Sequence, residues 1–214
     1  IFEVSANGSL SRAGVVAVGL EPVALAARGN NQLWVSNHLS DSVSLVDVSD
    51  PATARVVATI LVGDEPRDIV VGGSAGNKIF VACAHRGQAL PFDPQFTTPG
   101  VGRSDVWVID ADAPSAQADV VVLFGDKPRA LAVTPDGSTV YAAVLHSGSQ
   151  TVVIPEVLVT PNGGAASFPP GSTPNQPETG LILTFDGSGN WLDADGRDWS
   201  SFVPFDLPDR DVFA

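Results

Sequence analysis

A segment that occurs three times constrains the fold of this chain more than any other feature. Each copy opens with Gly-x-x-Pro, at Gly19/Pro22, Gly63/Pro66 and Gly125/Pro128. An alternating apolar strand follows, then a turn, then a second strand that begins with an aromatic residue: Trp34, Phe80 or Tyr141. The glycines are 44 and 62 residues apart. Self-similarity at such spacings predicts a fold assembled from repeated small sheets, with a loop inserted in the longer copy.

These copies resemble the YVTN family of β-propeller repeats. Residues 18–61 match the family pattern along their whole length, including LWVSNHLSDSVSLVDVS and RVVATI. Residues 124–144 match its first half, including TPDGSTVYAAV, whereas the middle copy has VGGSAGNK in place of a Pro-Asp-Gly turn. The family occurs in surface-layer and other exported bacterial and archaeal proteins. The resemblance therefore implies a β-propeller that is extracellular, on the cell surface or in the periplasm.

The composition also favours strands. The 214 residues are 44% apolar and include 21 Gly and 17 Pro, and no segment has a sustained apolar stripe at helical spacing. We therefore expect an all-β fold, with an irregular Pro/Gly/Ser-rich stretch at residues 161–179. A hairpin with an Asp-Gly turn at either end is expected after that stretch, in GLILTFDGSGNWLDADGRDW.

The order of strands predicts an incomplete propeller. We expect residues 1–17 to be the last two strands of a preceding blade, 18–61 a blade, and 62–123 a blade with a loop insertion at 86–104. Residues 124–214 would be an incomplete blade with a long insertion at 147–209, and RDVFA at its end would be the third strand. That gives about 13 strands, whereas four blades of four strands need about 16. The prediction is a partial β-propeller of about three four-stranded blades, not closed by this chain alone and a fragment of a larger propeller.

Charge and cysteine content exclude some classes of function. A net charge of −13 argues against nucleic acid or an anionic membrane as partner, because phosphate binding needs clustered Lys and Arg. Cys83 is the one cysteine, so an intrachain disulfide and a CxxC motif are excluded. No apolar run approaches the ~18 residues of a membrane span. The absence of Met, even at position 1, is expected of a processed or excised piece.

The three histidines, His38, His85 and His146, each follow the second strand of a copy. In a propeller these positions share one face with the loops that lead to the next blade, which we call the loop face. Imidazoles that converge there would bind a ligand or a metal ion. The alternative is that each histidine bonds a neighbouring loop backbone.

Other candidate ligand-binding residues lie in the same loops. GDEPR and GDKPR place Asp64, Arg67, Asp126 and Arg129 at matching positions, where they would bind ions or form inter-blade Arg–Asp bridges. Trp191 and Trp199 would either line a binding surface or attach the hairpin to the propeller. Trp34 and Trp107 are expected in blade cores, and Cys83 is expected to face the interface between two blades.

An acidic stretch offers a weak metal site. Asp193, Asp195 and Asp198 supply carboxylates suited to Ca²⁺, but an EF-hand loop needs a Glu at its twelfth position, and this stretch has none. Asp-Gly turns explain the spacing equally well. No cofactor is predicted, and the alternatives are Ca²⁺ or a His-bound metal ion.

These features together favour a non-enzymatic, exported or cell-surface propeller module. Through the loop face it would bind a protein, a glycan or a surface-layer partner, and its other partners would be the remaining blades, on the same parent chain or a partner chain. The alternative is the propeller portion of a periplasmic metal- or haem-dependent oxidoreductase, completed by further segments.

Overall fold

The structure is a computed structural model that describes residues 1–84, 104–123, 125–146, 150–163, 180–203 and 211–214. These residues form two compact units. The first unit contains the described residues up to His146 together with 211–214, and the second contains the described residues between 150 and 203.

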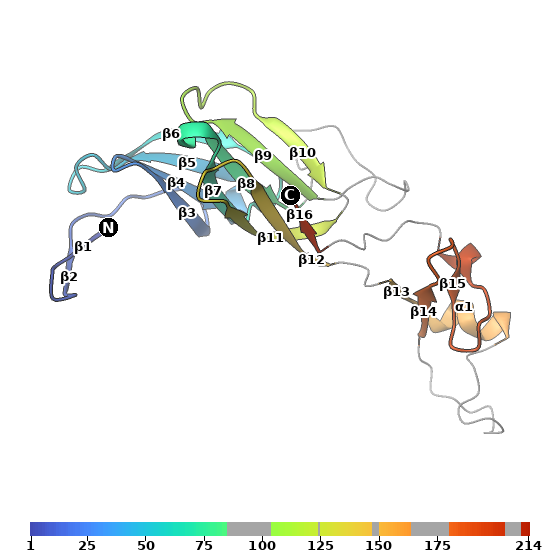
Figure 1. Cartoon of the computed structure of the whole chain (residues 1–214). Helices are drawn as coiled ribbons and strands as arrows, with labels where there is room; N and C mark the ends of the chain where they lie inside the picture. Colours follow the sequence, from blue (N-terminus) through green and yellow to red (C-terminus); the bar gives the residue numbers. More distant parts are fainter. Residues whose placement is uncertain (85–103, 124, 147–149, 164–179, 204–210) are drawn as a thin grey trace. The chain divides into compact units, whose positions relative to one another are not determined.

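Two antiparallel four-stranded sheets make up most of the first unit (Figure 1). The first sheet consists of β3 (Pro22–Arg28), β4 (Gln32–Asn37), β5 (Ser42–Asp47) and β6 (Arg55–Leu61). The second sheet consists of β7 (Asp68–Gly72), β8 (Lys78–Cys83), β9 (Ser104–Asp110) and β10 (Asp119–Leu123). Short 3₁₀ turns, η1 (His38–Ser40) and η2 (Ser74–Gly76), connect strands in these sheets. Each strand pairs with the next along the chain, which is the topology of a propeller blade.

The third sheet has three strands among the described residues, β11 (Asp126–Val133), β12 (Val140–His146) and β16 (Val212–Phe213). β16 pairs with β12, with Phe213 opposite Ala142. The prediction that RDVFA supplies the third strand is therefore confirmed. β16 is the outermost strand of this sheet in the part of the chain that the structure describes.

The three sheets stack face to face, with their first strands β3, β7 and β11 in contact. One hydrophobic cluster joins the first and second sheets and includes Trp34, Leu45, Ile79, Val81 and Trp107. Another joins the second and third sheets and includes Ala82, Val106, Leu123, Leu131 and Ala142. Side chains alternate along a strand, so the second sheet is covered on both faces. The fold is an all-β, partial propeller that the described strands do not close.

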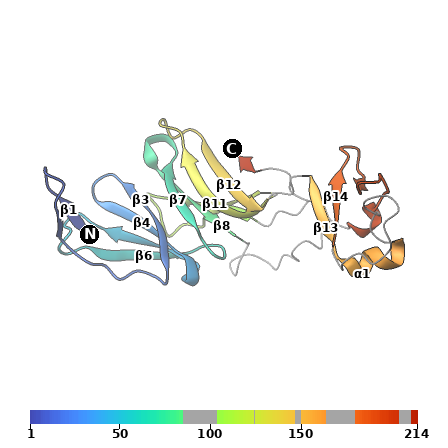
Figure 2. The ribbon, with the colours of Figure 1, turned by 90° about the horizontal axis from the view of Figure 1, so that it is seen from below.

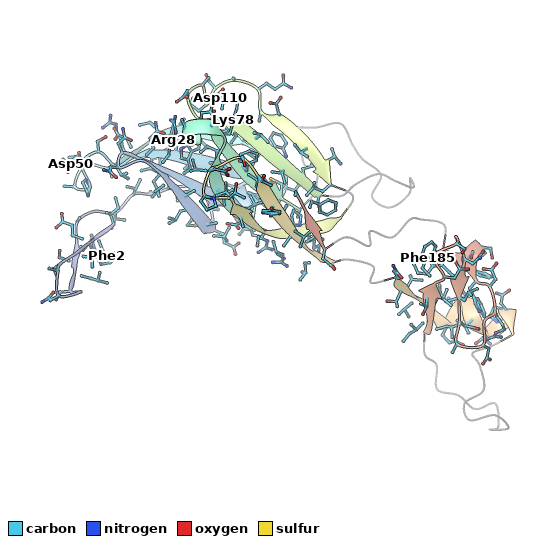
Figure 3. The ribbon with its side chains drawn as sticks, viewed as in Figure 1. Phe2, Arg28, Asp50, Lys78, Asp110 and Phe185 are labelled. Carbon is cyan, nitrogen blue, oxygen red and sulfur yellow. The ribbon has the colours of Figure 1, made fainter. Side chains whose placement is uncertain are left out.

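Polar contacts also join neighbouring sheets. Arg28 of the first sheet donates from Nε to the Gly76 carbonyl at 2.8 Å and pairs with Asp112 at 2.5 Å, both in turns of the second sheet. Figure 3 shows Arg28 near Lys78 and Asp110, which form an ion pair at 3.1 Å. Between the second and third sheets, Leu131 N donates to Asp68 Oδ2 at 2.7 Å.

The N-terminal strands β1 (Phe2–Val4) and β2 (Leu10–Arg12) pair only with each other in the described structure. Their assignment to a preceding blade, and the blade boundaries at 18–61 and 62–123, stay predictions. The predicted insertion at 86–104 lies outside the described residues, apart from Ser104 at the start of β9.

The second unit has a small sheet of its own (Figure 2), made of β13 (Thr151–Ile154), β14 (Leu181–Phe185) and β15 (Trp191–Leu192). Three short helical segments accompany the sheet: α1 (Glu156–Val159), η3 (Thr160–Asn162) and η4 (Ser200–Phe202). The predicted hairpin is confirmed, because β14 pairs with β15 and Asp186 N donates to the Asn190 carbonyl across the turn at 3.0 Å. β13 and α1 were not predicted. None of the helices in the described ranges has the length and apolar character to cross a membrane.

Candidate functional site

The first predicted ligand residue, His38, is largely enclosed by protein. It begins η1 directly after β4, and only 6% of its surface is exposed. Its Nδ1 has no hydrogen-bond partner among the described residues. Its backbone N–H donates to the Glu21 carbonyl at 2.9 Å, which ties the end of β4 to the first Gly-x-x-Pro turn. The imidazole is therefore not presented on an exposed surface.

Buried polar side chains surround the strand ends beside His38. Asn37 Nδ2 donates to Ser44 Oγ at 3.0 Å, and Ser40 Oγ accepts from Leu20 N at 3.0 Å. A Cβ on Gly19 would lie 2.4 Å from Ser40 Oγ and 2.7 Å from Asn37 Cγ, so these side chains would have to move. This contact explains why the copy begins with glycine and shows that the polar groups hold the turn against the sheet.

The other two histidines cannot be compared with His38 side chain for side chain. His85 and the imidazole of His146 lie outside what the structure describes. The strand registers nevertheless separate the positions, because Pro22 is opposite Asn37 whereas Pro128 is opposite Val144. His38 comes one residue after Asn37, but His146 comes two after Val144. His38 and His146 are therefore one residue apart in the repeat and do not occupy the same position. A site shared by the three histidines stays a prediction.

The residue before each repeat proline has a left-handed backbone. Glu21, Glu65 and Lys127 have φ values of 52°, 49° and 55°. Such values are uncommon for residues with a side chain. Three equivalent turns therefore share one constrained shape on the loop face.

The structure describes only some of the predicted charged residues of these turns. Arg67 lies 3.8 Å from Glu65 of its own turn, and Arg129 is exposed. The main-chain oxygen of Asp64 accepts from Ala84 N at 2.9 Å. The Asp126 side chain lies outside the described part, so a repeated Arg–Asp bridge stays a prediction. A half-exposed pair such as Arg67–Glu65 contributes little to stability.

Both predicted tryptophans of the insertion are interior residues. Trp191 and Trp199 belong to the hydrophobic cluster of the second unit, with Ile154, Val159 and Leu183. The expectation that they line a binding surface is therefore wrong, because their indoles are buried against their own unit. In the first unit, Trp34, Trp107 and Cys83 are buried as predicted. Burial raises the pKa of the Cys83 thiol well above its usual value, and the nearby Asp105 carboxylate adds to the effect.

The weak calcium candidates serve as hydrogen-bond acceptors for their own turn. Both carboxylate oxygens of Asp193 accept hydrogen bonds, from the backbone N–H groups of Asp195 and Arg197 and from the side chains of Arg197 and Trp199. Asp198 accepts from the backbone N–H of Ser200 at 2.9 Å. Within the described ranges, no three His, Cys, Asp or Glu side chains are grouped so that they could hold a metal ion.

The surfaces that the sequence did not point out are the outer faces of the stack. Leu25, Ile69 and Leu131 are each the sixth residue after a repeat glycine, opposite Val35, Val81 and Ala142 on the second strand. Ile69 and Leu131 are buried, with 3% and 8% of their surfaces exposed, against the sheet that precedes each. Leu25 is 65% exposed. We call the exposed side of the first sheet, which carries Val23, Leu25, Val57 and Leu61, the preceding face.

At the other end of the stack, a position that is enclosed in the first two sheets is again exposed in the third. Trp34 packs against the second sheet, and Phe80 packs against the third. Tyr141 is the equivalent residue of the third sheet and is 42% exposed. We call this side, with Tyr141, Leu145 and Val212, the following face. The three copies therefore differ at these equivalent positions, which are buried between neighbouring sheets but exposed on the outer sides of the first and third sheets in the part of the chain that the structure describes.

Comparisons with known proteins give structural likenesses only. No family model matches the chain, and no curated protein matches it either. A putative 6-phosphogluconolactonase from Bacteroides fragilis is 13% identical, with a TM-score of 0.49, over 99% of this chain and 50% of that one. A functionally unknown protein from Desulfotomaculum acetoxidans is 14% identical, with a TM-score of 0.44, over 71% and 45% of the two chains.

A third solved structure is the PQQ-bound aldose sugar dehydrogenase from Streptomyces coelicolor. It is 16% identical, with a TM-score of 0.40, over 86% of this chain and 47% of that one. The chain spans about half the length of these three proteins. Likeness at this level says nothing about activity. The description of the preceding and following faces depends only on the geometry of the molecule itself.

Proposed function

We propose that this chain is a non-enzymatic binding module of an exported or cell-surface β-propeller. Its partners are further sheets of the same kind, on the same parent chain or a partner chain, which dock on the preceding and following faces. The exported location rests on the resemblance to YVTN repeats. Binding of a protein, glycan or surface-layer partner through the loop face belongs to the same proposal.

The observation that carries this proposal is the exposure of Leu25, at a position where Ile69 and Leu131 are buried. An apolar residue of this size gains roughly 1.5–3 kcal/mol when it is fully buried. Exposed apolar strand faces of this kind favour association with other protein. A face with the same repeat pattern as two buried ones is suited to the same occupant, another sheet.

The two open faces are also complementary to each other. Where the first and second sheets meet, the side of the first sheet that carries Trp34 packs on the side of the second that carries Ile69. These sides are equivalent to the following face and the preceding face, so the structure already contains an interface of this kind. Tyr141 of one copy would meet Leu25 of another in the relation that Trp34 has to Ile69. The simplest available partner for either face is therefore a second copy, arranged head to tail.

Native mass spectrometry with variants tests the proposal. We expect the wild-type chain to form species of at least twice the monomer mass as its concentration rises. Leu25→Asp and Tyr141→Asp should each reduce association about tenfold or more, since each buries a charge at the interface. Leu39→Asp is the matched control, because Leu39 is as exposed as Leu25 but lies in η1.

Two results would contradict the proposal. One is a wild-type chain that stays monomeric at high concentration, and the other is equal association in the Leu25→Asp and Leu39→Asp variants. A native mass that exceeds the denatured mass by a metal ion or haem would instead favour the oxidoreductase alternative.

A further inference from the structure

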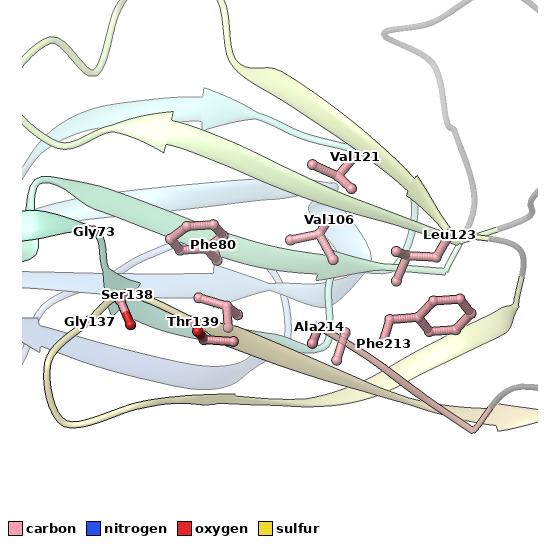
Figure 4. A pocket seen from close by; sticks show the side chains of 12 residues that line it. Gly73, Phe80, Val106, Val121, Leu123, Gly137, Ser138, Thr139, Phe213 and Ala214 are labelled. Atoms are coloured by element: carbon pink, nitrogen blue, oxygen red, sulfur yellow. The ribbon is translucent and has the colours of Figure 1, made fainter.

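A cavity of about 400 Å³ lies between two turns of the first unit, at the end of the stack away from the loop face. One turn, residues 73–77, joins β7 to β8, and the other, residues 134–139, joins β11 to β12. The two turns meet at Gly73 and Gly137 (Figure 4), where Gly73 N donates to the Gly137 carbonyl at 2.9 Å. A Cβ on Gly137 would lie 2.6 Å from the Gly73 carbonyl oxygen, so this close approach depends on glycine.

The corresponding gap between the first and second sheets is occupied by an arginine side chain. Arg28 ends β3, nine residues after the repeat glycine, and its guanidinium donates to the Gly76 carbonyl at 2.8 Å and contacts Asp112 at 2.5 Å. The residue nine after the next repeat glycine is Gly72, which ends β7. A Cβ on Gly72 would lie 2.9 Å from the Phe80 ring. The second sheet therefore places no cationic side chain at the position from which Arg28 reaches the next sheet.

Asp136 supplies a carboxylate to the cavity between the second and third sheets. Its Oδ1 accepts hydrogen bonds from the Thr134 hydroxyl at 2.6 Å and from the backbone N–H and the hydroxyl of Ser138. Its Oδ2 only shares the Ser138 hydroxyl, at 3.0 Å, and a hydroxyl has a single proton to donate. Oδ2 therefore keeps lone pairs for a donor from outside the turn. The same contacts lower the pKa of Asp136 to about 2, so the carboxyl is ionised at neutral pH.

The lining of the cavity narrows the chemistry of its ligand. Of the described residues around it, Asp136 alone is ionisable, which favours a ligand with one positive charge. The volume is far larger than a metal ion needs, and no three metal-binding side chains are grouped in the described ranges. Val71 and Pro135 supply an apolar wall that an aliphatic chain can contact. The glycines of the first turn have no side chains to cover their main-chain carbonyls, which are further acceptors.

We propose that this cavity binds a guanidinium group on an aliphatic chain, with an N–H donated to Asp136 Oδ2 and the chain against the apolar wall. A guanidinium presents five donors in a planar fork, so it can reach a carboxylate and main-chain carbonyls together, whereas an ammonium is a compact, strongly hydrated charge. The molecule already uses Arg28 in this way between its first two sheets. The group would come from an arginine of a partner polypeptide or from a free guanidinium compound. The inference does not depend on the proposed function, because the cavity is separate from the preceding, following and loop faces.

The probe is n-butylguanidinium, which reproduces an arginine side chain, and n-butylammonium is the matched control compound. We expect the amide NMR signals of Gly73, Gly76 and Gly137 to shift saturably as n-butylguanidinium is added. Binding of n-butylammonium should be about tenfold weaker, because its donors are not arranged in a planar fork.

Two variants test the role of the carboxylate. Asp136→Asn should weaken binding of n-butylguanidinium about tenfold or more, because hydrogen bonds to charged groups are the stronger ones. Asp186→Asn is the matched control. Asp186 begins the same Asp-Gly-Ser sequence and accepts from Ser188 N at 2.7 Å, but a Cβ on Gly187 would meet nothing within 4 Å, so no second turn faces it.

A third variant leaves the Asp136 turn untouched. Ala75 is exposed and lines the cavity, and its φ of 58° is close to the 55° of Lys127, so a lysine is compatible with this backbone. Ala75→Lys should place a competing ammonium beside Asp136 and abolish binding. Circular dichroism of each variant checks that the sheets still form, and Leu25→Asp should leave binding unchanged while it reduces association.

Three results would overturn the inference: no saturable shift, equal binding to the Asp136→Asn and Asp186→Asn variants, or equal affinity for the two compounds. The tripeptide acetyl-Gly-Arg-Gly-amide distinguishes the two sources of the group. Tighter binding of the tripeptide than of n-butylguanidinium supports an arginine of a partner polypeptide, and weaker binding supports a free guanidinium compound.

Discussion

Asp193 organises the last turns of the second unit through four hydrogen bonds. Its Oδ1 accepts from the backbone N–H groups of Asp195 and Arg197, each at 2.9 Å. Its Oδ2 accepts from Arg197 Nε at 2.7 Å and from Trp199 Nε1 at 3.0 Å. One side chain therefore holds the backbone turn and fixes a core indole.

Substitution of Asp193 should destabilise the second unit. We expect Asp193→Ala to reduce the free energy of unfolding by about 1.5–3 kcal/mol, because it leaves buried donors without their charged acceptor. Hydrogen exchange should accelerate in β14 and β15, and the exposed Asp195→Asn variant is the control. Equal exchange in the two variants would contradict this role.

The effect of Asp193 should also depend on pH. Burial by itself would raise the pKa of this carboxyl, but the hydrogen bonds from Arg197 and Trp199 outweigh burial and lower it. A carboxyl with a lowered folded pKa stabilises the protein fully above its unfolded value, near 3.9. Its contribution is lost as the pH falls through the folded value. The stability difference between wild type and Asp193→Asn should therefore be largest near neutral pH and shrink below about pH 4.

Asp136 offers a second titration test, in the turn between β11 and β12. The Thr134 hydroxyl, and then the backbone and side chain of Ser138, lower the pKa of Asp136 to about 2. We expect carboxyl ¹³C chemical shifts to report that value. Thr134→Val should raise the pKa of Asp136 toward its ordinary value, whereas Thr59→Val on β6 should leave it unchanged. An unaltered pKa in Thr134→Val would show that the hydroxyl contact is not formed.

At the scale of elements, Arg28 connects the first two sheets at the end away from the loop face. Arg28→Lys should reduce the free energy of unfolding in urea by about 1–2 kcal/mol, because an ammonium cannot reproduce the forked contacts to Gly76, Gln32 and Asp112. Arg55→Lys is the control, since its 3.6 Å pair with Asp47 is surface-exposed. Similar losses in both variants would show that Arg28 is not a specific connector.

The strands of the propeller sheets were predictable because the residue pattern within each copy is sufficient to specify them. Alternating apolar residues, an Asp-Gly or glycine-rich turn and an aromatic residue specify two paired strands locally. Trp34 and Trp107 were predicted in the interior because they occupy strand positions. β13 was not predictable, because it pairs with β14 across a long sequence separation and has no repeat counterpart. Trp199 is buried and its Nε1 donates to Asp193, a contact that the Asp-Gly spacing alone does not specify.

The candidate site was harder to predict than the fold. Sequence reasoning selected polar residues of the loops, but His38 lies buried beneath its own turn. Leu25 looks like any other core residue in the sequence, and its exposure depends on whether a sheet stands in front of it. Whether Leu25 is exposed depends on how the sheets are stacked, and the sequence of a single repeat does not specify that stacking.

At the scale of the whole molecule, net charge should control association. Two copies with a net charge of −13 repel each other, and salt screens that repulsion over about 10 Å at 0.1 M ionic strength. We expect head-to-tail association to strengthen when ionic strength rises from about 10 to 150 mM. Analytical ultracentrifugation measures this, with Leu25→Asp as the variant that should stay monomeric. Association that weakens with salt would indicate an interface held by ion pairs instead.

The difference between the preceding and following faces has a geometric consequence. An interface between two unlike surfaces leaves one of each exposed after every addition, so docking of one copy creates the site for the next. The rotation between neighbouring sheets then decides the product. If successive rotations sum to a full circle, the copies form a closed ring, and if they do not, growth continues as a fibre. Electron microscopy of concentrated samples would distinguish the two, and a change at Tyr141 or Leu25 should abolish both.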